Sequence, residues 1–269
     1  MVQGLRLKQE RENINFLSQK LGESIVQSIA YVEHNGKSYH VLKHGTSRTL
    51  EDVMRTGSPE EKLKCMEEAA RLLAEIHKSR IPEPVLATED SYYHNRLLSC
   101  FFEQLANNQS CKQIPSSLRN EISSLGERIQ KELADAPTGW YKDANLRNWL
   151  VEDNWRVVAI DFEHRVMLPV HLDLVSMLEF DPVPAPNEIK DRVINYYVDE
   201  FYPKCRYSME KFIHHYTIAA LQRHLEIAGY RARDRNTKGI MFHLGRARAY
   251  AYKIGEKTFA EKLGQIVIS

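Results

Sequence analysis

The sequence carries two carboxylates and one amide at spacings that suit metal chemistry. Asp143, Asn148 and Asp161 all lie in the stretch 140–163, which reads WYKDANLRNWLVEDNWRVVAIDFE. Two short apolar runs within it surround a turn-prone Glu-Asp-Asn, which predicts a β-hairpin. Because a hairpin brings its two ends together, we expect Asn148 and Asp161 to converge near Asp143. Carboxylate and amide oxygens are hard ligands, so the set predicts a Mg²⁺ site rather than a zinc site.

These residues also follow the order that the kinase fold uses for phosphoryl transfer, in which Asp-x-x-x-x-Asn precedes a metal-binding Asp. The stretch resembles the aminoglycoside phosphotransferase and choline kinase family, whose loop reads His-Gly-Asp-x-x-x-x-Asn and whose metal motif is often Asp-Phe-Glu. Here Tyr141 stands at the His place and Lys142 at the Gly place. The alternative is an ordinary acidic hairpin, because Asp and Asn are common at turns.

The resemblance implies an ATP- and Mg²⁺-dependent small-molecule kinase. In that family Asp143 would accept or orient the proton of the substrate hydroxyl, whereas Asn148 and Asp161 would bind Mg²⁺ on the nucleotide phosphates. An unshifted carboxylate is a weak base, so alignment would be the main role of Asp143. Arg147 would either contact the transferring phosphoryl group or point away from it.

The implied fold is α+β, a protein kinase-like fold of two lobes. A reduced N-terminal lobe would span 1–46, with the hinge at about 42–46, and a mostly helical C-terminal lobe would span 47–269. Hydrophobic periodicity and turn signals predict strands at 25–33 and 38–43, joined by Asn35-Gly36. The same signals predict helices at 8–21, 58–78, 92–107, 115–134, 188–201, 209–228 and 238–263.

The family's small lobe normally begins with a Gly-rich hairpin and a strand that carries a phosphate-binding Lys, and no Gly-rich loop is present here. Lys8 is the only early candidate for that Lys, and Glu12 is the better candidate for its partner. Their four-residue spacing is also that of a surface ion pair on a helix. Either the small lobe is trimmed or the chain lacks its natural start.

Two further residues have structural interpretations. The resemblance implies that Asp173, in the segment 169–175, accepts hydrogen bonds from the backbone of the catalytic loop; the alternative is a simple carboxylate at a helix N-terminus. His77 ends the helix 58–78, in a Leu-Ala-x-x-His segment. We interpret it as a packed or capping histidine rather than a catalytic one.

The composition is that of a soluble globular protein, with 43% hydrophobic and 27% charged residues over 269 positions. A formal net charge of +1 gives no reason to expect nucleic acid or an acidic membrane surface as a partner. No apolar run is long enough to span a membrane, and the charged N-terminus argues against a secretory signal. Four scattered cysteines are typical of a cytoplasmic protein with reduced thiols.

The C-terminal region gives the acceptor's class. The segment 220–230, with Arg223 and His224, is similar to the Gln-Arg-His-Leu segment of bacterial cell-wall amino-sugar kinases, although shared helix packing would give the same letters. Basic residues outnumber acidic ones about two to one beyond residue 190, whereas a polycationic aminoglycoside needs an acidic cleft. We therefore favour a sugar or amino sugar as the small-molecule hydroxyl substrate.

Two other function classes remain open. One is a catalytically silent nucleotide- or metabolite-binding protein, which the absent Gly-rich loop and the altered catalytic loop favour. The other is a metal-dependent hydrolase that uses the same carboxylates, although the His-rich motifs of such enzymes are absent.

Overall fold

The computed structural model describes residues 2–43, 45–79, 85–86, 96–140, 142–164, 166–179, 183–201 and 207–268. Contacts divide the chain into two compact units, each built from two stretches of sequence. The first unit comprises 1–86 and 138–206, and the second comprises 87–137 and 207–269. The lobe boundary expected near residue 46 falls inside the first unit and stays a prediction.

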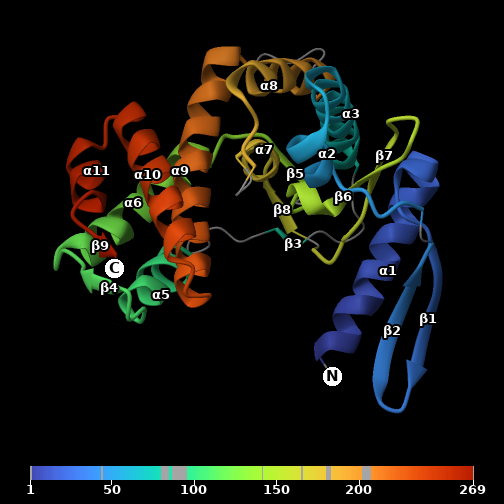
Figure 1. The fold of residues 1–269 in the computed structure, drawn as a ribbon, viewed down its shortest axis with the longest axis horizontal. Helices are drawn as coiled ribbons and strands as arrows, with labels where there is room; N and C mark the ends of the chain where they lie inside the picture. Colours follow the sequence, from blue (N-terminus) through green and yellow to red (C-terminus); the bar gives the residue numbers. More distant parts are fainter. Residues whose placement is uncertain are drawn as a thin grey trace. The chain divides into compact units, whose positions relative to one another are not determined.

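Among its described residues, the first unit contains five α-helices and most of the strands (Figure 1). Its helices are α1 (Val2–Leu21), α2 (Leu50–Thr56), α3 (Pro59–Lys78), α7 (His171–Leu178) and α8 (Asn187–Phe201). Its strands are β1 (Ser28–His34), β2 (Lys37–Leu42), β3 (Val85–Leu86), β5 (Thr138–Trp140), β6 (Trp149–Val151), β7 (Val157–Ala159) and β8 (Val166–Pro169).

The predicted N-terminal elements are confirmed. Helix α1 ends before Gly22, whose φ of +59° suits a helix stop. Strands β1 and β2 pair antiparallel around Asn35 and Gly36, whose φ angles of 50° and 72° are those of a type I′ turn. Figure 1 shows this hairpin alongside α1.

The β-hairpin predicted within 140–163 is also confirmed, as β6 paired antiparallel with β7. The segment after α1 adds to it, because Ile25 pairs in parallel with Ala159 and the Val26 N–H donates to the Ala159 carbonyl at 3.0 Å. A separate small sheet has the order β3-β8-β5, with β3 parallel and β5 antiparallel to β8. The predicted helix 58–78 is α3, which starts at the cap Ser58. Helices α3 and α8 pack on each other.

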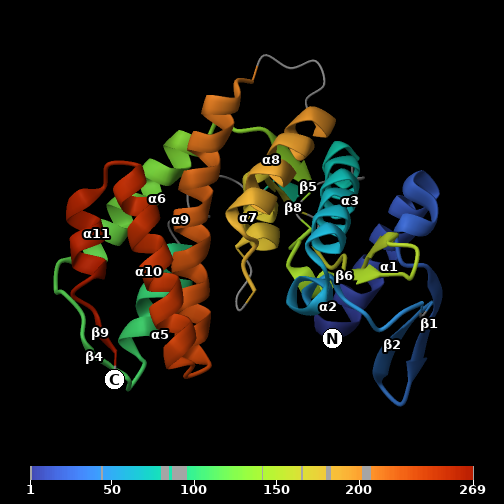
Figure 2. The same ribbon diagram turned by 45° about the horizontal axis from the view of Figure 1, so that its top comes forward.

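The second unit is mostly helical, and its long helices run side by side in Figure 2. Its helices are the π-helical η2 (Arg96–Phe102), α5 (Glu103–Ala106), α6 (Leu118–Leu133), α9 (Met209–Arg233), α10 (Thr237–Lys253) and α11 (Lys257–Leu263). Strands β4 (Cys111–Gln113) and β9 (Val267–Ile268) pair antiparallel.

The prediction of one helix over 238–263 is wrong. The chain forms α10 and α11 because Gly255 adopts a φ of +84°, which ends the first helix. Gly229, near the C-terminal end of α9, serves close packing instead. A Cβ atom there would lie 1.6 Å from the main-chain oxygen of Cys100, so only glycine lets α9 approach η2.

A buried histidine pair lies between α9 and α10. His224 and His243 are both fully buried, and their Nδ1 atoms lie 2.8 Å apart, so one ring donates and the other accepts. Burial lowers the pKa of His243 from 6.5 to about 2, and positive charge on His224, Arg231, Arg223 and Arg246 lowers it further in the same direction. His243 is therefore neutral in the folded protein.

This pair predicts a loss of stability in acid. The unfolded chain protonates His243 below about pH 6.5 whereas the folded chain does not, so the free energy of unfolding should fall as the pH drops from 6.5 towards 2. The slope from this residue reaches at most about 1.4 kcal/mol per pH unit. Urea unfolding between pH 7 and pH 4 measures it. The slope should be shallower in His243→Gln and unchanged in His34→Gln, an exposed control; equal slopes in all three proteins would contradict the prediction.

Candidate active site

The catalytic loop folds around the main-chain oxygen of Asp143. This oxygen accepts hydrogen bonds from the backbone N–H of Asn145 at 2.8 Å and from Nδ2 of Asn148 at 2.9 Å. Asp143 adopts a φ of +55°, a left-handed conformation that Asp and Asn tolerate better than most residues. Asn148 is buried at the end of a short 3₁₀ turn, η3 (Leu146–Asn148), that leads into β6. The sequence spacing thus brings Asp143 and Asn148 into direct contact.

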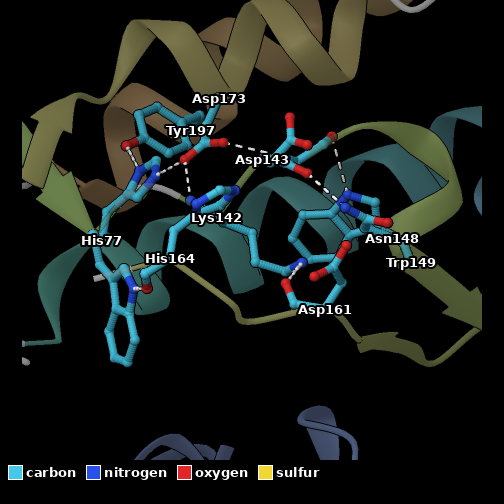
Figure 3. A network of polar contacts seen from close by, with 11 residues as sticks. His77, Lys142, Asp143, Asn148, Trp149, Asp161, His164, Asp173 and Tyr197 are labelled. Carbon is cyan, nitrogen blue, oxygen red and sulfur yellow. Dashed lines mark hydrogen bonds and ion pairs between the residues drawn. The ribbon is translucent and has the colours of Figure 1, made fainter. Parts of the chain in front are cut away.

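Asp161 follows β7 at the other end of the hairpin. The backbone N–H of Ile160 donates to the main-chain oxygen of Asn148 at 3.1 Å, which joins the two ends. Asp161 also has a positive φ, +65°, so the chain turns sharply out of the ladder at this residue. Figure 3 shows Asp143, Asn148 and Asp161 gathered on one side of a polar network, as the hairpin predicts.

Asp173, near the start of α7, lies on the other side of this network and fixes the loop. It is buried, and its two oxygens accept from the backbone N–H groups of Lys142 at 2.8 Å and Ala144 at 2.9 Å, on either side of Asp143. The expected backbone hydrogen bonds are confirmed. Asp173 Oδ2 lies 3.0 Å from Nε2 of His77, whose Nδ1 lies 2.6 Å from the hydroxyl of Tyr197 (Figure 3). His77 is therefore a packed, hydrogen-bonded histidine, as interpreted from the sequence.

Sequence reasoning noted Lys142 only as a departure from the family's loop. Its side chain is 1% exposed, and its Nζ donates to the main-chain oxygens of Ile160 and of Asp161, the latter at 3.0 Å. Burial lowers the pKa of Lys142 from 10.5 to about 8, and the carboxylates of Asp161, Asp173, Asp143 and Glu10 oppose that shift. The sequence shows only that a lysine stands at the family's Gly place, and this does not predict which groups its ammonium contacts.

Asn13 of α1 was missed entirely. It is 2% exposed, and its Nδ2 donates to the main-chain oxygens of Phe162 at 2.6 Å and His164 at 3.2 Å. The indole Nε1 of Trp140 donates to the same His164 oxygen at 2.8 Å. The segment after Asp161 is thus bonded to α1 and to β5.

Arg147 is turned towards α2. Its Nε lies 2.6 Å from Oε2 of the buried Glu51, which also accepts from Arg55. Both arginines lower the pKa of Glu51, with the hydrogen bond from Arg147 as the largest cause. Of the two alternatives for Arg147, the ion pair with α2 is the one that the structure contains.

Lys8 and Glu12 are both exposed on α1. At about 100° per residue they lie on the face of the helix opposite the stripe of Asn13, Ile14 and Leu17. That stripe is buried, and its Asn13 donates to the main-chain oxygens of Phe162 and His164. The role of Lys8 and Glu12 in nucleotide binding stays a prediction.

A recess lies beside the predicted hinge. Apolar side chains from two segments face it, Ile25 and Val26 after α1 and Leu150 and Val158 from the hairpin. The hinge residues Lys43, Gly45 and Thr46 line it as well. We call this the hinge recess. At its rim Arg156 pairs with Glu23 and, at 2.7 Å, with Glu152.

The oxygens of Asn148 and Asp161 suit Mg²⁺, which needs few protein ligands, better than a metal that takes all its ligands from the protein. Among the residues that the structure describes, no group of three or more His, Cys, Asp or Glu side chains could ligate a metal. Mg²⁺ usually takes one or two protein oxygens and completes its shell with phosphate and water. Because Nδ2 of Asn148 is used by Asp143, its Oδ1 is the atom left to ligate a cation beside Asp161. Tyr141, at the family's His place, lies outside the described residues.

The segment 220–230, from which the acceptor class was predicted, lies in the second unit. His224 is fully buried against His243 and stacks on Tyr250, and Arg223 pairs with Glu226 at 3.3 Å. Helix packing therefore accounts for His224.

Within the described chain, none of the helices is both long enough and apolar enough to cross a membrane. A family model described as the phosphotransferase enzyme family matches residues 5–207. The chain belongs to this family. The predicted family and its kinase-like fold are thereby confirmed, and the similarity of 220–230 to amino-sugar kinases stays a prediction. No curated protein sequence matches this phosphotransferase.

Solved structures share its fold at low sequence identity. A choline kinase from Cryptosporidium parvum is 15% identical with a TM-score of 0.61, and the match covers 96% of this chain and 80% of that one. An ethanolamine kinase from Plasmodium vivax is 13% identical with a TM-score of 0.59, over 94% and 73% of the two chains. An ADP-bound aminoglycoside phosphotransferase is 17% identical with a TM-score of 0.60, over 96% and 83%.

The buried carboxylate of Asp173 predicts a large loss of stability on removal of its charge. An amide in Asp173→Asn offers one acceptor oxygen and directs an N–H₂ group at a backbone N–H, so one buried loop amide loses its partner. The free energy of unfolding should fall by about 2–4 kcal/mol, measured by urea unfolding. Asp191→Asn, at an exposed position of α8, should change it by less than about 0.5 kcal/mol. Equal stability of the two variants would contradict the assignment.

Proposed function

We propose that this phosphotransferase transfers the γ-phosphoryl group of ATP, with Mg²⁺, to a hydroxyl group of a small metabolite. The observation that carries the proposal is the convergence of Asp143, Asn148 and Asp161 on one hairpin, in the chain order of the kinase reaction. An ordinary acidic hairpin would not need a buried carboxylate bonded on both sides of its catalytic position, as Asp173 is here.

Each residue has a separate role in this proposal. Asp143 aligns the acceptor hydroxyl and receives its proton, and the hydrogen bonds to its main-chain oxygen from Asn145 and Asn148 hold its backbone in place. Asn148 and Asp161 ligate the metal with one amide and one carboxylate oxygen. Bound Mg²⁺ would neutralise the charge of the nucleotide phosphates.

The hinge recess is the proposed site of the nucleotide base. Its apolar walls suit the faces of a planar ring, and the backbone of the hinge offers polar groups at the edge. A structural neighbour binds ADP, which supports an adenine nucleotide. Lys8 and Glu12 remain the pair that the family resemblance suggests for the phosphates, and ATP affinity of a Lys8→Ala protein decides that role.

A sugar or amino sugar is the proposed acceptor. The basis is the similarity of 220–230 to amino-sugar kinases and the excess of basic residues beyond residue 190. Structural neighbours are named as choline, ethanolamine and aminoglycoside kinases, so these acceptors belong in the same assay. The unbridged Cys65, Cys100 and Cys111 favour action in the cytoplasm.

The test is phosphoryl transfer from labelled ATP with Mg²⁺ across sugars, amino sugars, choline-like alcohols and aminoglycosides. Asp143→Asn and Asp161→Asn remove a charge but keep a residue that tolerates positive φ. Each should lower kcat by about 10²–10⁴-fold, because alignment of the hydroxyl or of the metal is lost. Asp199→Asn, on the exposed surface of α8, should leave kcat unchanged.

Other outcomes would replace the proposal. ATP binding without transfer to any acceptor would identify a silent nucleotide-binding protein. Release of free phosphate without an acceptor would identify a hydrolase. Transfer that survives in both Asn variants would remove Asp143 and Asp161 from the chemistry.

A further inference from the structure

The segment that carries Asp161 is fixed by side chains rather than by a sheet. It lies between the end of β7 at Ala159 and the start of β8 at Val166. Four of its main-chain oxygens, at Ile160, Asp161, Phe162 and His164, accept hydrogen bonds from side chains of other elements. The donors are Lys142 of the catalytic loop, Asn13 of α1 and Trp140 of β5.

A buried lysine such as Lys142 is unfavourable for folding unless its charge is compensated. Burial of an ammonium group carries a large desolvation penalty unless hydrogen bonds compensate it, and an apolar side chain of the same length would fill the space at lower cost. The compensation observed is specific. The Nζ contacts the two main-chain oxygens and lies 4.6 Å from the ring centroid of Phe162 and 5.5 Å from that of Trp149.

The position of this ammonium connects the two carboxylates of the site. The backbone N–H of Lys142 is bonded to Asp173, and the next residue is Asp143. Its side chain ends at the backbone of Asp161, which lies 19 positions further along the chain. One residue therefore fixes both the alignment carboxylate and the metal carboxylate (Figure 3).

Asn13 completes the arrangement from the other side. Its amide donates to the oxygens of Phe162 and His164, directly after Asp161. Because the side chain of Asn13 is buried and bonds to both oxygens, α1 helps to support the segment 160–164. Lys142 and Asn13 thus fix the chain before and after the turn at Asp161.

We propose that Lys142 and Asn13 are positioning residues that direct the Asp161 carboxylate towards Asn148 for Mg²⁺ binding. This inference rests on the proposed function, in which Asp161 and Asn148 ligate the metal. Neither residue touches the reacting atoms; both act through the backbone of 160–164.

The first experiment uses the protein without nucleotide or metal. Hydrogen exchange of the amides in 160–164 is compared between wild type, Lys142→Met and Lys190→Met. Lys190 of α8 is the matched control, a largely buried lysine that pairs with Glu179 at the end of α7. Exchange in 160–164 should be at least about tenfold faster in Lys142→Met and within about twofold of wild type in Lys190→Met. Wild-type exchange in Lys142→Met would overturn the proposal.

The second experiment measures ADP affinity by calorimetry with and without Mg²⁺. The gain in affinity that Mg²⁺ gives to wild type should fall at least about tenfold in Lys142→Met and persist in Lys190→Met. Asp161→Asn runs beside them. Loss of the gain in Asp161→Asn with retention in Lys142→Met overturns the positioning role alone. Retention in Asp161→Asn, or no gain in wild type, overturns the metal ligand itself and hence the proposed function.

Two further variants cover a failure of Lys142→Met to fold. Lys142→Gln keeps an N–H donor at shorter reach and should give an intermediate loss of the Mg²⁺ gain. Asn13→Ala removes the second support and should speed exchange in 160–164, whereas Asn15→Ala, at an exposed position of α1, should not. A wild-type Mg²⁺ gain and wild-type exchange in both variants would overturn the proposal.

Discussion

The site depends on one buried carboxylate. The loop around Asp143 makes few of the regular bonds of a helix or sheet, yet its backbone amides are buried and need acceptors. Asp173 supplies them from the start of α7, on both sides of Asp143; His77 of α3 contacts Asp173 in turn, and Tyr197 of α8 contacts His77. Three helices therefore set the conformation of a loop that could not keep it alone. The conformation of the backbone around Asp143 is a consequence of this packing.

Local signals in the sequence were sufficient for the central elements of the site. Apolar runs around a turn fix a hairpin, and the hairpin alone brings Asn148 and Asp161 together. The Asn-Gly turn of β1 and β2 and the Ser-Pro start of α3 are equally local, and all are present. Family resemblance then added Asp173, whose bonding to the loop has no local signal.

Long-range contacts account for what the sequence did not reveal. Asn13 contacts a residue 149 positions away, and nothing in its helix distinguishes it from an exposed amide. Lys142 stands out as a letter, but its direction is set by Phe162 and Trp149 around it. The sheet β3-β8-β5 joins strands of two to four residues, too short for periodicity to predict. A glycine such as Gly255 can end a helix, but glycine also occurs inside helices, so residue type alone did not predict the break between α10 and α11.

The parallel bridge between Ile25 and Ala159 has a mechanical consequence. Ile25 and Val26 form one wall of the hinge recess, and Ala159 is two residues before Asp161. One backbone bridge therefore joins the wall proposed to contact the nucleotide base to the strand that leads to Asp161, the residue proposed to bind metal at the phosphates. A bound nucleotide would therefore span two segments that this bridge and the hydrogen bond from the Val26 N–H to the Ala159 carbonyl hold together.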